Sequence, residues 1–277
     1  MIDDVILLRH GRTTFNLHRR MQGQIDVPLD IIGQWQVDQS AYELAKTLYW
    51  AKVSSIADHP DQLVQPDPHA ARRSDIEEYR QAPAARRLLR IVSSDLFRAQ
   101  QTAHAFADLM RLPVELDTRL RERSFGQWEG MTREEIRRMD AEAYASWKAH
   151  TGGELAYGVE SREAVGRRGA QAVASMLADA GAQPRPTTLM LVGHGSWIVA
   201  TVATLLGLDP DSLNALGAVR NACWSRMTPV YDGDVVSWQL DQYNQGPAIA
   251  RLTDWENGPQ DLRRPDMPMW KPITVSA

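Results

Sequence analysis

Short apolar runs alternate along the chain with longer segments whose apolar residues recur every three to four positions. The apolar runs lie at residues 5–8, 88–94, 113–117 and 187–193. All but the third are continuous and end in polar residues or glycine, as interior strands of a sheet covered on both faces do. Helical patterns lie between them, at residues 33–50, 97–110, 132–148 and 161–180. This alternation predicts an α/β fold, a three-layer α/β/α sandwich around a largely parallel sheet.

Three segments depart from the alternation. Residues 223–231 and 235–240, joined by DGD, predict a hairpin at a sheet edge. Residues 53–87 hold four prolines and many charges, and they interrupt the path from the first helix to the second strand. Residues 244–277 hold five prolines, so they cannot form one helix. We therefore expect one domain over residues 1–243 with an insertion at about 53–87, followed by a Pro-rich extension; each added segment is either mobile surface or a lid or subunit contact.

The composition narrows the class of protein further. The chain has 277 residues, 43% of them hydrophobic and 24% charged, which is enough for a sizeable core. Its net charge of −4 gives no overall field that favours nucleic acid or an anionic membrane. The single cysteine, Cys223, excludes an internal disulfide and fits a reducing compartment. Because the first ten residues match neither a secretory signal nor a membrane span, we expect a cytoplasmic protein.

Reactive side chains follow the ends of the predicted strands. The first strand ends in Arg9-His10-Gly11 and the last in Gly193-His194-Gly195, while Arg98 follows the second strand and Glu122 the third. Ligands of α/β sheets bind beyond the carboxyl ends of the strands. Arginines and imidazoles suit a tetrahedral oxyanion such as a phosphoryl group, whereas a glutamate there suits proton transfer. Since no metal-ligand spacing is present, arginines must neutralise the charge of the ligand.

Five blocks of this sequence resemble the histidine phosphatase superfamily, in its phosphoglycerate mutase-like branch. They are RHGRTTFN, MQGQIDVPL, SSDLFRAQQTA, LRERSFGQWEG and VGHGS, and they occur in the order of the family. One RHG tripeptide alone would be weak evidence, but several ordered blocks make coincidence improbable. The resemblance implies a phosphoglycerate mutase-like fold with no cofactor and no metal, and a small phosphomonoester as substrate.

The resemblance also assigns roles to residues of these blocks. It implies that His10 attacks phosphorus to form a phosphohistidine and that Glu122 protonates the leaving alkoxide, then takes a proton from the hydrolytic water. It implies that the phosphoryl and substrate oxygens are bound by Arg9, Asn16, Gln22, Gly23, Arg98 and His194. A neutral imidazole with one free nitrogen is required for the attack, so the other nitrogen needs a hydrogen-bond acceptor.

Several residues keep an alternative interpretation. Glu129 lies near Glu122 and is the other candidate acid, and Trp197 either begins a core helix or lines the pocket. Arg12 stands where many relatives carry an acidic residue or glutamine; it either binds a second anionic group of the substrate or forms a salt bridge. The remaining histidines, residues 18, 59, 69, 104 and 150, show no spacing typical of a site.

The superfamily contains phosphatases, mutases and catalytically silent relatives. Cofactor-dependent phosphoglycerate mutases carry a WRRS-type region, which is replaced here by EEIRRMDAEAYASWKAH, and this favours hydrolysis. Within the phosphatases, segments such as RMQGQIDVPL, LDTRLRE and NACWSRM are similar to the actinobacterial glucosyl-3-phosphoglycerate phosphatases. If the substrate carries a carboxylate, the candidates to bind it are Arg12, Arg19 and Arg20. A homodimer is a further expectation from the resemblance.

Overall fold

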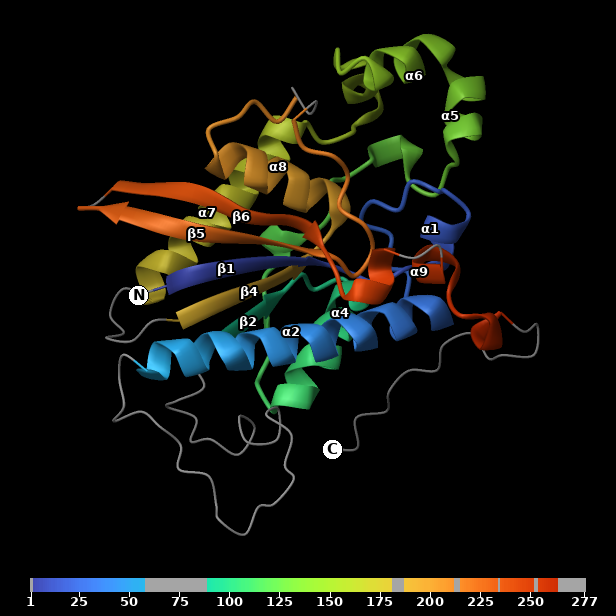
Figure 1. The fold of residues 1–277 in the computed structure, drawn as a ribbon. Coiled ribbons are helices and arrows are strands. Elements are labelled where there is room, and N and C mark those ends of the chain that lie inside the picture. Colours follow the sequence, from blue (N-terminus) through green and yellow to red (C-terminus); the bar gives the residue numbers. More distant parts are fainter. Residues whose placement is uncertain are drawn as a thin grey trace.

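The chain folds into a three-layer α/β/α sandwich (Figure 1). The computed structural model describes residues 2–57, 89–180, 187–211, 215–233, 235–251 and 254–263. The strands are β1 (Ile2–Arg9), β2 (Leu89–Ser93), β3 (Glu115–Leu116), β4 (Thr187–Gly193), β5 (Trp224–Asp232) and β6 (Val235–Gln245). The helices are α1 (Thr14–Leu17), α2 (Ile31–Ala57), α4 (Phe97–Met110), α5 (Arg133–Met139), α6 (Ala141–Lys148), α7 (Arg162–Ala180), α8 (Gly195–Leu205) and α9 (Asp254–Asn257).

The sheet has the strand order β3-β2-β4-β1-β5-β6. The four strands from β3 to β1 run parallel, and β5 and β6 form an antiparallel hairpin on one edge. The predicted fold class, the largely parallel sheet and the edge hairpin are therefore confirmed. In β1 and β4 the register pairs Leu7 with Leu191 and Arg9 with Gly193. Because parallel partners advance together, the next residue of each strand, His10 and His194, also lie side by side.

Both faces of the sheet are buried, and alternate residues of each central strand serve opposite faces. Val5 and Leu7 of β1 join a cluster with α7 and α8, while Ile6 and Leu8 join a cluster with α2 and α4. Figure 1 shows these two helix pairs on opposite sides of the sheet. This two-sided burial explains why the strands read as continuous apolar runs.

The pair α5 and α6 stands apart from the sandwich, above the carboxyl ends of the strands (Figure 1). The sequence predicted one helix at 132–148, but Asp140 ends α5 with φ −153° and begins α6 by accepting a hydrogen bond from the Ala143 amide at 2.9 Å. A small cluster around Trp128 and Ile136 supports this pair. The break lets the segment turn and cover one side of the site.

The structure describes only the first residues of the predicted insertion but a larger part of the C-terminal Pro-rich segment. Helix α2 extends to Ala57, and the rest of the predicted insertion lies outside the described residues. The C-terminal segment forms short helical turns, and Trp255 of α9 is 1% exposed within the main core cluster. The described part of the tail therefore packs on the domain. Cys223 is buried in the same cluster, as expected for a core thiol. None of the described helices is long and apolar enough to cross a membrane.

The start of α2 touches the backbone of the loop that follows β1. A Cβ atom added at Gly33 would lie 1.9 Å from the carbonyl oxygen of Arg12, and one added at Gly11 would lie 2.5 Å from the carbonyl oxygen of Gly33. Asp30 caps this turn, since its carboxylate accepts from the Gly33 amide at 2.7 Å. Glycine is required on both sides because the two backbones are in direct contact.

We expect Gly33→Ala to lower the free energy of unfolding by at least about 2 kcal/mol, because the backbone contact leaves no room for a methyl group. This outcome opposes helix propensity, which favours alanine by about 1 kcal/mol. Urea unfolding measures the change. Gly217→Ala is the matched control, since a Cβ there would meet nothing within 4 Å. Equal stability of the two variants would contradict the close packing of α2 on the loop.

Candidate active site

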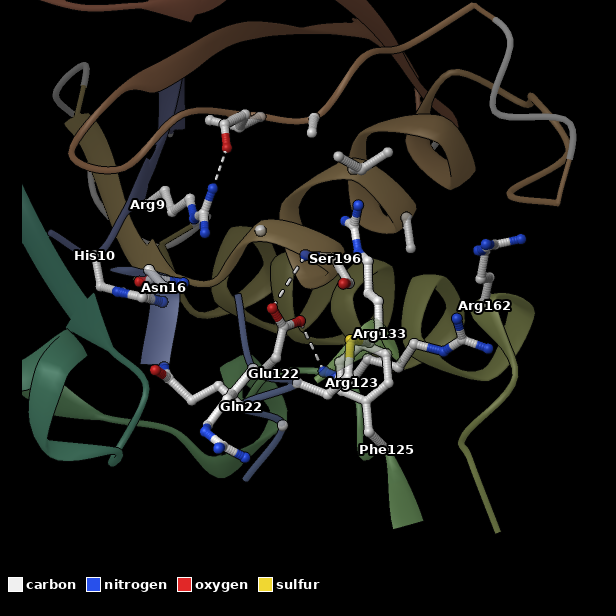
Figure 2. A pocket seen from close by; sticks show the side chains of 18 of the residues that line it. Arg9, His10, Asn16, Gln22, Glu122, Arg123, Phe125, Arg133, Arg162 and Ser196 are labelled. Atoms are coloured by element: carbon white, nitrogen blue, oxygen red, sulfur yellow. Dashed lines mark hydrogen bonds between the residues drawn. The ribbon is translucent and has the colours of Figure 1, made fainter. Parts of the chain in front are cut away.

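A pocket of about 360 Å³ opens where the carboxyl ends of β1 and β4 meet the α5–α6 region. Figure 2 places Arg9, His10 and Asn16 on one side of it and Arg123, Arg133 and Arg162 on the other, with Glu122 between them. The position agrees with the rule that ligands of α/β sheets bind beyond the carboxyl ends of the strands. Five arginines and one glutamate line this pocket, so it suits an anion.

His10 is 2% exposed and has one nitrogen fixed by a hydrogen bond. Its Nδ1 atom lies 2.6 Å from the carbonyl oxygen of Gly11, which can only accept, so Nδ1 carries the proton and Nε2 holds the lone pair. Burial, followed by the charges of Arg98 and Arg9, lowers the pKa of His10 well below its usual value of 6.5. The imidazole is therefore neutral at physiological pH, which is the form that can attack phosphorus.

His194 faces His10, and the centroids of the two rings are 5.1 Å apart. Its Nε2 atom lies 2.9 Å from Ser94 Oγ, while its buried Nδ1 atom has no partner among the described residues. Burial and the charge of Arg98 hold the pKa of His194 well below its usual value as well. An unpartnered nitrogen in a buried ring next to His10 is a group that a ligand can satisfy.

Two guanidinium groups flank the imidazoles. Arg98 is fully buried and donates to the carbonyl oxygens of Gly23 and Ile25 at 2.7 and 2.9 Å. Burial lowers the pKa of Arg98 to about 10, so the side chain stays charged at physiological pH. Arg9 donates to the carbonyl of Val219 and keeps a buried Nε atom with no partner in the described part of the chain. These charges can neutralise a phosphoryl group.

Backbone amides hold the carboxylate of Glu122. Its oxygens accept from the amides of Arg123, Trp197 and Ser196 at 2.8, 3.1 and 3.2 Å, the last two at the start of α8. The loop itself is tied to α7, because Arg168 donates to the Glu122 carbonyl oxygen at 3.0 Å. Glu122 lines the pocket, so it can exchange a proton with a ligand there.

Glu129, the other candidate acid, is not among the residues that line the pocket. Its carboxylate accepts from the amides of Gln24 and Phe125, both at 3.0 Å, and so stabilises the loops. Gly23 lies against it with φ +53°, and a Cβ at Gly23 would be 2.2 Å from Glu129 Oε1. Glycine is therefore required where the MQGQ block enters the pocket.

Asn16 and Gln22 also line the pocket. Asn16 Oδ1 accepts from the Thr13 amide at 3.2 Å and from Asn221 Nδ2 at 3.2 Å. Gln22 Oε1 accepts from the hydroxyl of Thr13. Each side chain therefore has its oxygen engaged by the protein and keeps its amide NH₂ group as a donor for a ligand.

Arg12 does not line the pocket of His10. Its Nε atom donates to Asp30 Oδ2 at 2.8 Å, and its Nη1 atom donates to the carbonyl oxygen of Glu256 at 2.7 Å. The salt-bridge interpretation of Arg12 therefore fits the structure. Arg19 lines a neighbouring pocket with Arg12, and Arg20, which does line the pocket of His10, is bonded to Gly130 and Glu135.

Trp197 is buried, and its indole donates to the Arg119 carbonyl oxygen at 2.9 Å. It is not among the lining residues of the pocket, so it belongs to the core. The described residues contain no group of three or more His, Cys, Asp or Glu side chains arranged to hold a metal ion.

The sequence pattern did not predict the wall of the pocket opposite His10. That wall includes Phe125, Trp147, Arg123, Arg133 and Arg162. Two of these arginines are the first residues of helices α5 and α7. A cation is unfavourable at the amino end of a helix dipole, and this is the signal by which the sequence could have marked these two arginines as candidate site residues.

Comparison with known proteins agrees with this geometry. The family model of the histidine phosphatase superfamily (branch 1) matches residues 5–57 and 73–245. The chain belongs to this superfamily. The match to this family and to relatives named as phosphatases supports a phosphoric monoester hydrolase.

The relatives include several phosphatases. Glucosyl-3-phosphoglycerate phosphatase of Mycolicibacterium vanbaalenii is 33% identical over 256 residues, which cover 89% of this chain and 96% of the relative. The structure of the mycobacterial glucosyl-3-phosphoglycerate phosphatase complexed with VO3 matches with a TM-score of 0.65 and 31% identity, over 88% of this chain and 100% of that one. A probable phosphoglycerate mutase GpmB of Yersinia enterocolitica is 30% identical, over 80% of this chain and 83% of its own length.

We expect His10 and His194 to remain neutral as the pH falls through 6.5, because burial and two arginines oppose a further positive charge. Below pH 6.5 the unfolded chain takes up a proton at each of these histidines, whereas the folded chain does not. The free energy of unfolding should therefore decrease as the pH falls below 6.5. NMR titration of the histidine ring protons measures it, with assignment from His10→Gln and His194→Gln. A chemical-shift transition of His10 centred at 6.5 would contradict the neutral nucleophile.

Proposed function

We propose that the protein hydrolyses a small phosphomonoester without a metal ion, through a phosphohistidine at His10. The observation that carries this proposal is a neutral imidazole, with its proton fixed on Nδ1 by Gly11, beside the buried guanidinium of Arg98 and the Nε group of Arg9. Fixed charges and donors of this kind act on the loose transition state of phosphoryl transfer.

The reaction has two displacements. His10 Nε2 forms a bond to phosphorus while the bond to the ester oxygen breaks, and Glu122 gives its proton to the leaving alkoxide. A water molecule then forms the second bond to phosphorus while the bond to Nε2 breaks, and Glu122 takes the proton of the water. Inorganic phosphate leaves, and both residues return to their starting state. Arg9, Arg98, His194, Asn16 and Gln22 bind the phosphoryl oxygens.

A phosphoglycerate mutase is the second candidate, favoured by the match to a probable phosphoglycerate mutase. We favour hydrolysis because the phosphatases of Mycolicibacterium vanbaalenii and Mycobacterium tuberculosis match at higher identity and over more of both chains. Conversion between 2- and 3-phosphoglycerate that needs a bisphosphate primer and outpaces phosphate release would favour the mutase.

The substrate we propose is an anionic phosphomonoester, resembling glucosyl-3-phosphoglycerate, with a carboxylate that lies away from the reacting phosphorus. Glucosyl-3-phosphoglycerate is the substrate in the names of the similar phosphatases from Mycolicibacterium vanbaalenii and Mycobacterium tuberculosis. The residues of the pocket wall opposite His10 also support a carboxylated substrate. Arg133 stands at the first residue of α5, and Arg162 has a carboxylate partner only at 3.6 Å, in Asp211. We assign the carboxylate to these two arginines in place of Arg12, Arg19 and Arg20, and the polyol part of the substrate to Phe125 and Trp147.

We further propose a cytoplasmic location, supported by the single buried thiol, and a homodimer, expected only from the family. Cell fractionation and sedimentation test these two statements separately.

We expect His10→Ala to lower kcat with p-nitrophenyl phosphate by at least about 10⁴-fold and to abolish the acid-labile phosphoenzyme, because the nucleophile is lost. Rapid-quench labelling with a radioactive phosphomonoester measures the intermediate. His104→Ala, at an exposed position on α4, is the control and should retain full activity. A chelator should leave the wild-type rate unchanged. Normal turnover by His10→Ala, or loss of activity with chelator that added metal restores, would refute the mechanism.

We expect Arg162→Ala and Arg133→Ala to raise KM about tenfold for a carboxylated phosphomonoester, equivalent to about 1.4 kcal/mol, and less than twofold for an uncharged sugar phosphate. Phosphate release from matched substrate pairs measures the difference. Arg167→Ala and Arg137→Ala are controls, since both arginines are exposed on the same helices and pair with glutamates. Equal KM changes for both substrates would exclude a carboxylate subsite while leaving the phosphatase activity intact.

A further inference from the structure

The turn that precedes β5 docks on the backbone of the nucleophile. The amide of Ala222 donates to the carbonyl oxygen of His10 at 3.1 Å, and Ser40 Oγ donates to the carbonyl oxygen of Ala222 at 2.7 Å. Ala222 has φ +55°, a left-handed conformation that is unfavourable for an alanine. Strain of this kind persists only where surrounding contacts hold it, and it is frequent at functional sites.

Asn221, in this turn, directs its amide at three oxygen atoms of the site. Its Nδ2 atom lies 3.1 Å from the His10 carbonyl, 3.2 Å from the Gly11 carbonyl and 3.2 Å from Asn16 Oδ1. Backbone carbonyls only accept, so the atom of Asn221 that contacts them must be the NH₂ group. Asn221 therefore donates to the same Gly11 carbonyl that holds the Nδ1 proton of His10.

The same contact determines the orientation of Asn16. The backbone amide of Thr13 only donates, so the Asn16 atom 3.2 Å from it must be Oδ1. Asn221 also donates to this oxygen, which leaves the Asn16 NH₂ group for the pocket. A flipped Asn16 would place its NH₂ group against two donors. Asn221 and the Thr13 amide therefore together set which end of Asn16 a phosphoryl oxygen meets.

A hydrogen bond from the C-terminal segment holds Asn221 in place. The indole Nε1 of Trp255 in α9 donates to the Asn221 carbonyl oxygen at 3.0 Å. The Trp255 and Glu256 carbonyl oxygens accept from Gln36 and Arg12, and Gln36 also accepts from the Arg12 amide at 2.9 Å. Residues 255 and 256 are thus bonded to both sides of the RHGR loop, through Arg12 on one side and Asn221 on the other.

We propose that Asn221 is a positioning residue for His10 and Asn16, and that Trp255 couples the C-terminal segment to the site through it. This proposal rests on the proposed function, because it takes His10 as the nucleophile. Neither residue lines the pocket of His10, so each acts through its hydrogen bonds. Helix α9, which carries Trp255 and Glu256, then supports the active site.

The first test is a double-mutant cycle on steady-state hydrolysis of p-nitrophenyl phosphate. Asn221→Ala should lower kcat/KM at least tenfold in the wild-type background and by a clearly smaller factor in an Asn16→Ala background, since one of its three acceptors is then absent while the His10 and Gly11 carbonyls remain. Equal effects in the two backgrounds would overturn the coupling to Asn16. Phosphohistidine labelling of the wild type is measured in parallel. Its absence would reject the proposed function, whereas labelling with additive effects would reject only the coupling between Asn221 and Asn16.

The second test replaces the neutral amide of Asn221 with a charged carboxylate. Asn221→Asp places a carboxylate against His10 and Gly11, which favours the imidazolium form of His10 and should move the acid limb of kcat/KM to higher pH. Asn221→Ala should show no such upward shift. A purely structural role would lower the melting temperature of both variants and leave the acid limb in place. An unmoved limb in Asn221→Asp would overturn the contact with the nucleophile.

The third test separates the hydrogen bond of Trp255 from its packing. Trp255→Phe removes the indole N–H and should lower kcat about fivefold or more. Trp35→Phe makes the same change in the other member of the aromatic pair, whose rings are 5.4 Å apart, and should change kcat less than twofold. Equal kcat values in the two variants would overturn the coupling through Trp255. A lower kcat in Trp255→Phe alone, at matched melting temperatures, would support it.

Discussion

Burial, together with repulsion among the positive charges it encloses, governs this site. Arg9 and Arg98 lie next to His10 and His194, where burial makes each additional charge costly. Since a guanidinium does not lose its proton at physiological pH, the imidazoles remain neutral instead. The same arrangement therefore provides two permanent cations for a phosphoryl group and a free lone pair for the attack. Glu122 is the acidic side chain that lines the pocket, and the amides at the start of α8 hold it.

This arrangement needs a rigid support, which the parallel register of β1 and β4 provides. Arg9 pairs with Gly193, so the two histidines follow from neighbouring strands at the same level. Backbone atoms then complete the site. The Gly11 carbonyl orients His10, the Gly23 and Ile25 carbonyls hold Arg98, and the close contact of Gly33 with Arg12 fixes the loop. Small shifts of these backbone segments would displace the His10 imidazole from its position beside the arginines. This is the physical reason for the tight contacts around the loop.

The proposed function assigns substrate specificity to different elements from those that carry the reaction. The phosphoryl end of the pocket comes from strand ends, while the opposite wall comes from the first residues of α5 and α7 and from the aromatic residues near them. These elements can vary without disturbing the sheet, as loops and added helices do in other α/β enzymes. The break at Asp140 belongs to this second set, because it turns the α5–α6 segment over the pocket.

The strands and their alternation with helices could be predicted from the sequence, and so could the candidate residues of the proposed reaction. Continuous apolar runs are typical of central strands, and His10, Arg98, Glu122 and His194 stand directly after such strands or in the blocks that follow them. Other features depend on how distant segments pack. Arg12 is bonded to Asp30 and to the carbonyl oxygen of Glu256. The Glu129 carboxylate accepts a hydrogen bond from a loop amide, and Arg133 and Arg162 line the pocket. An arginine on a helix has the same local pattern whether it faces solvent or a ligand, since long-range packing fixes its direction. The role proposed for Asn221 depends on hydrogen bonds to residues more than 200 positions away, which no local pattern encodes.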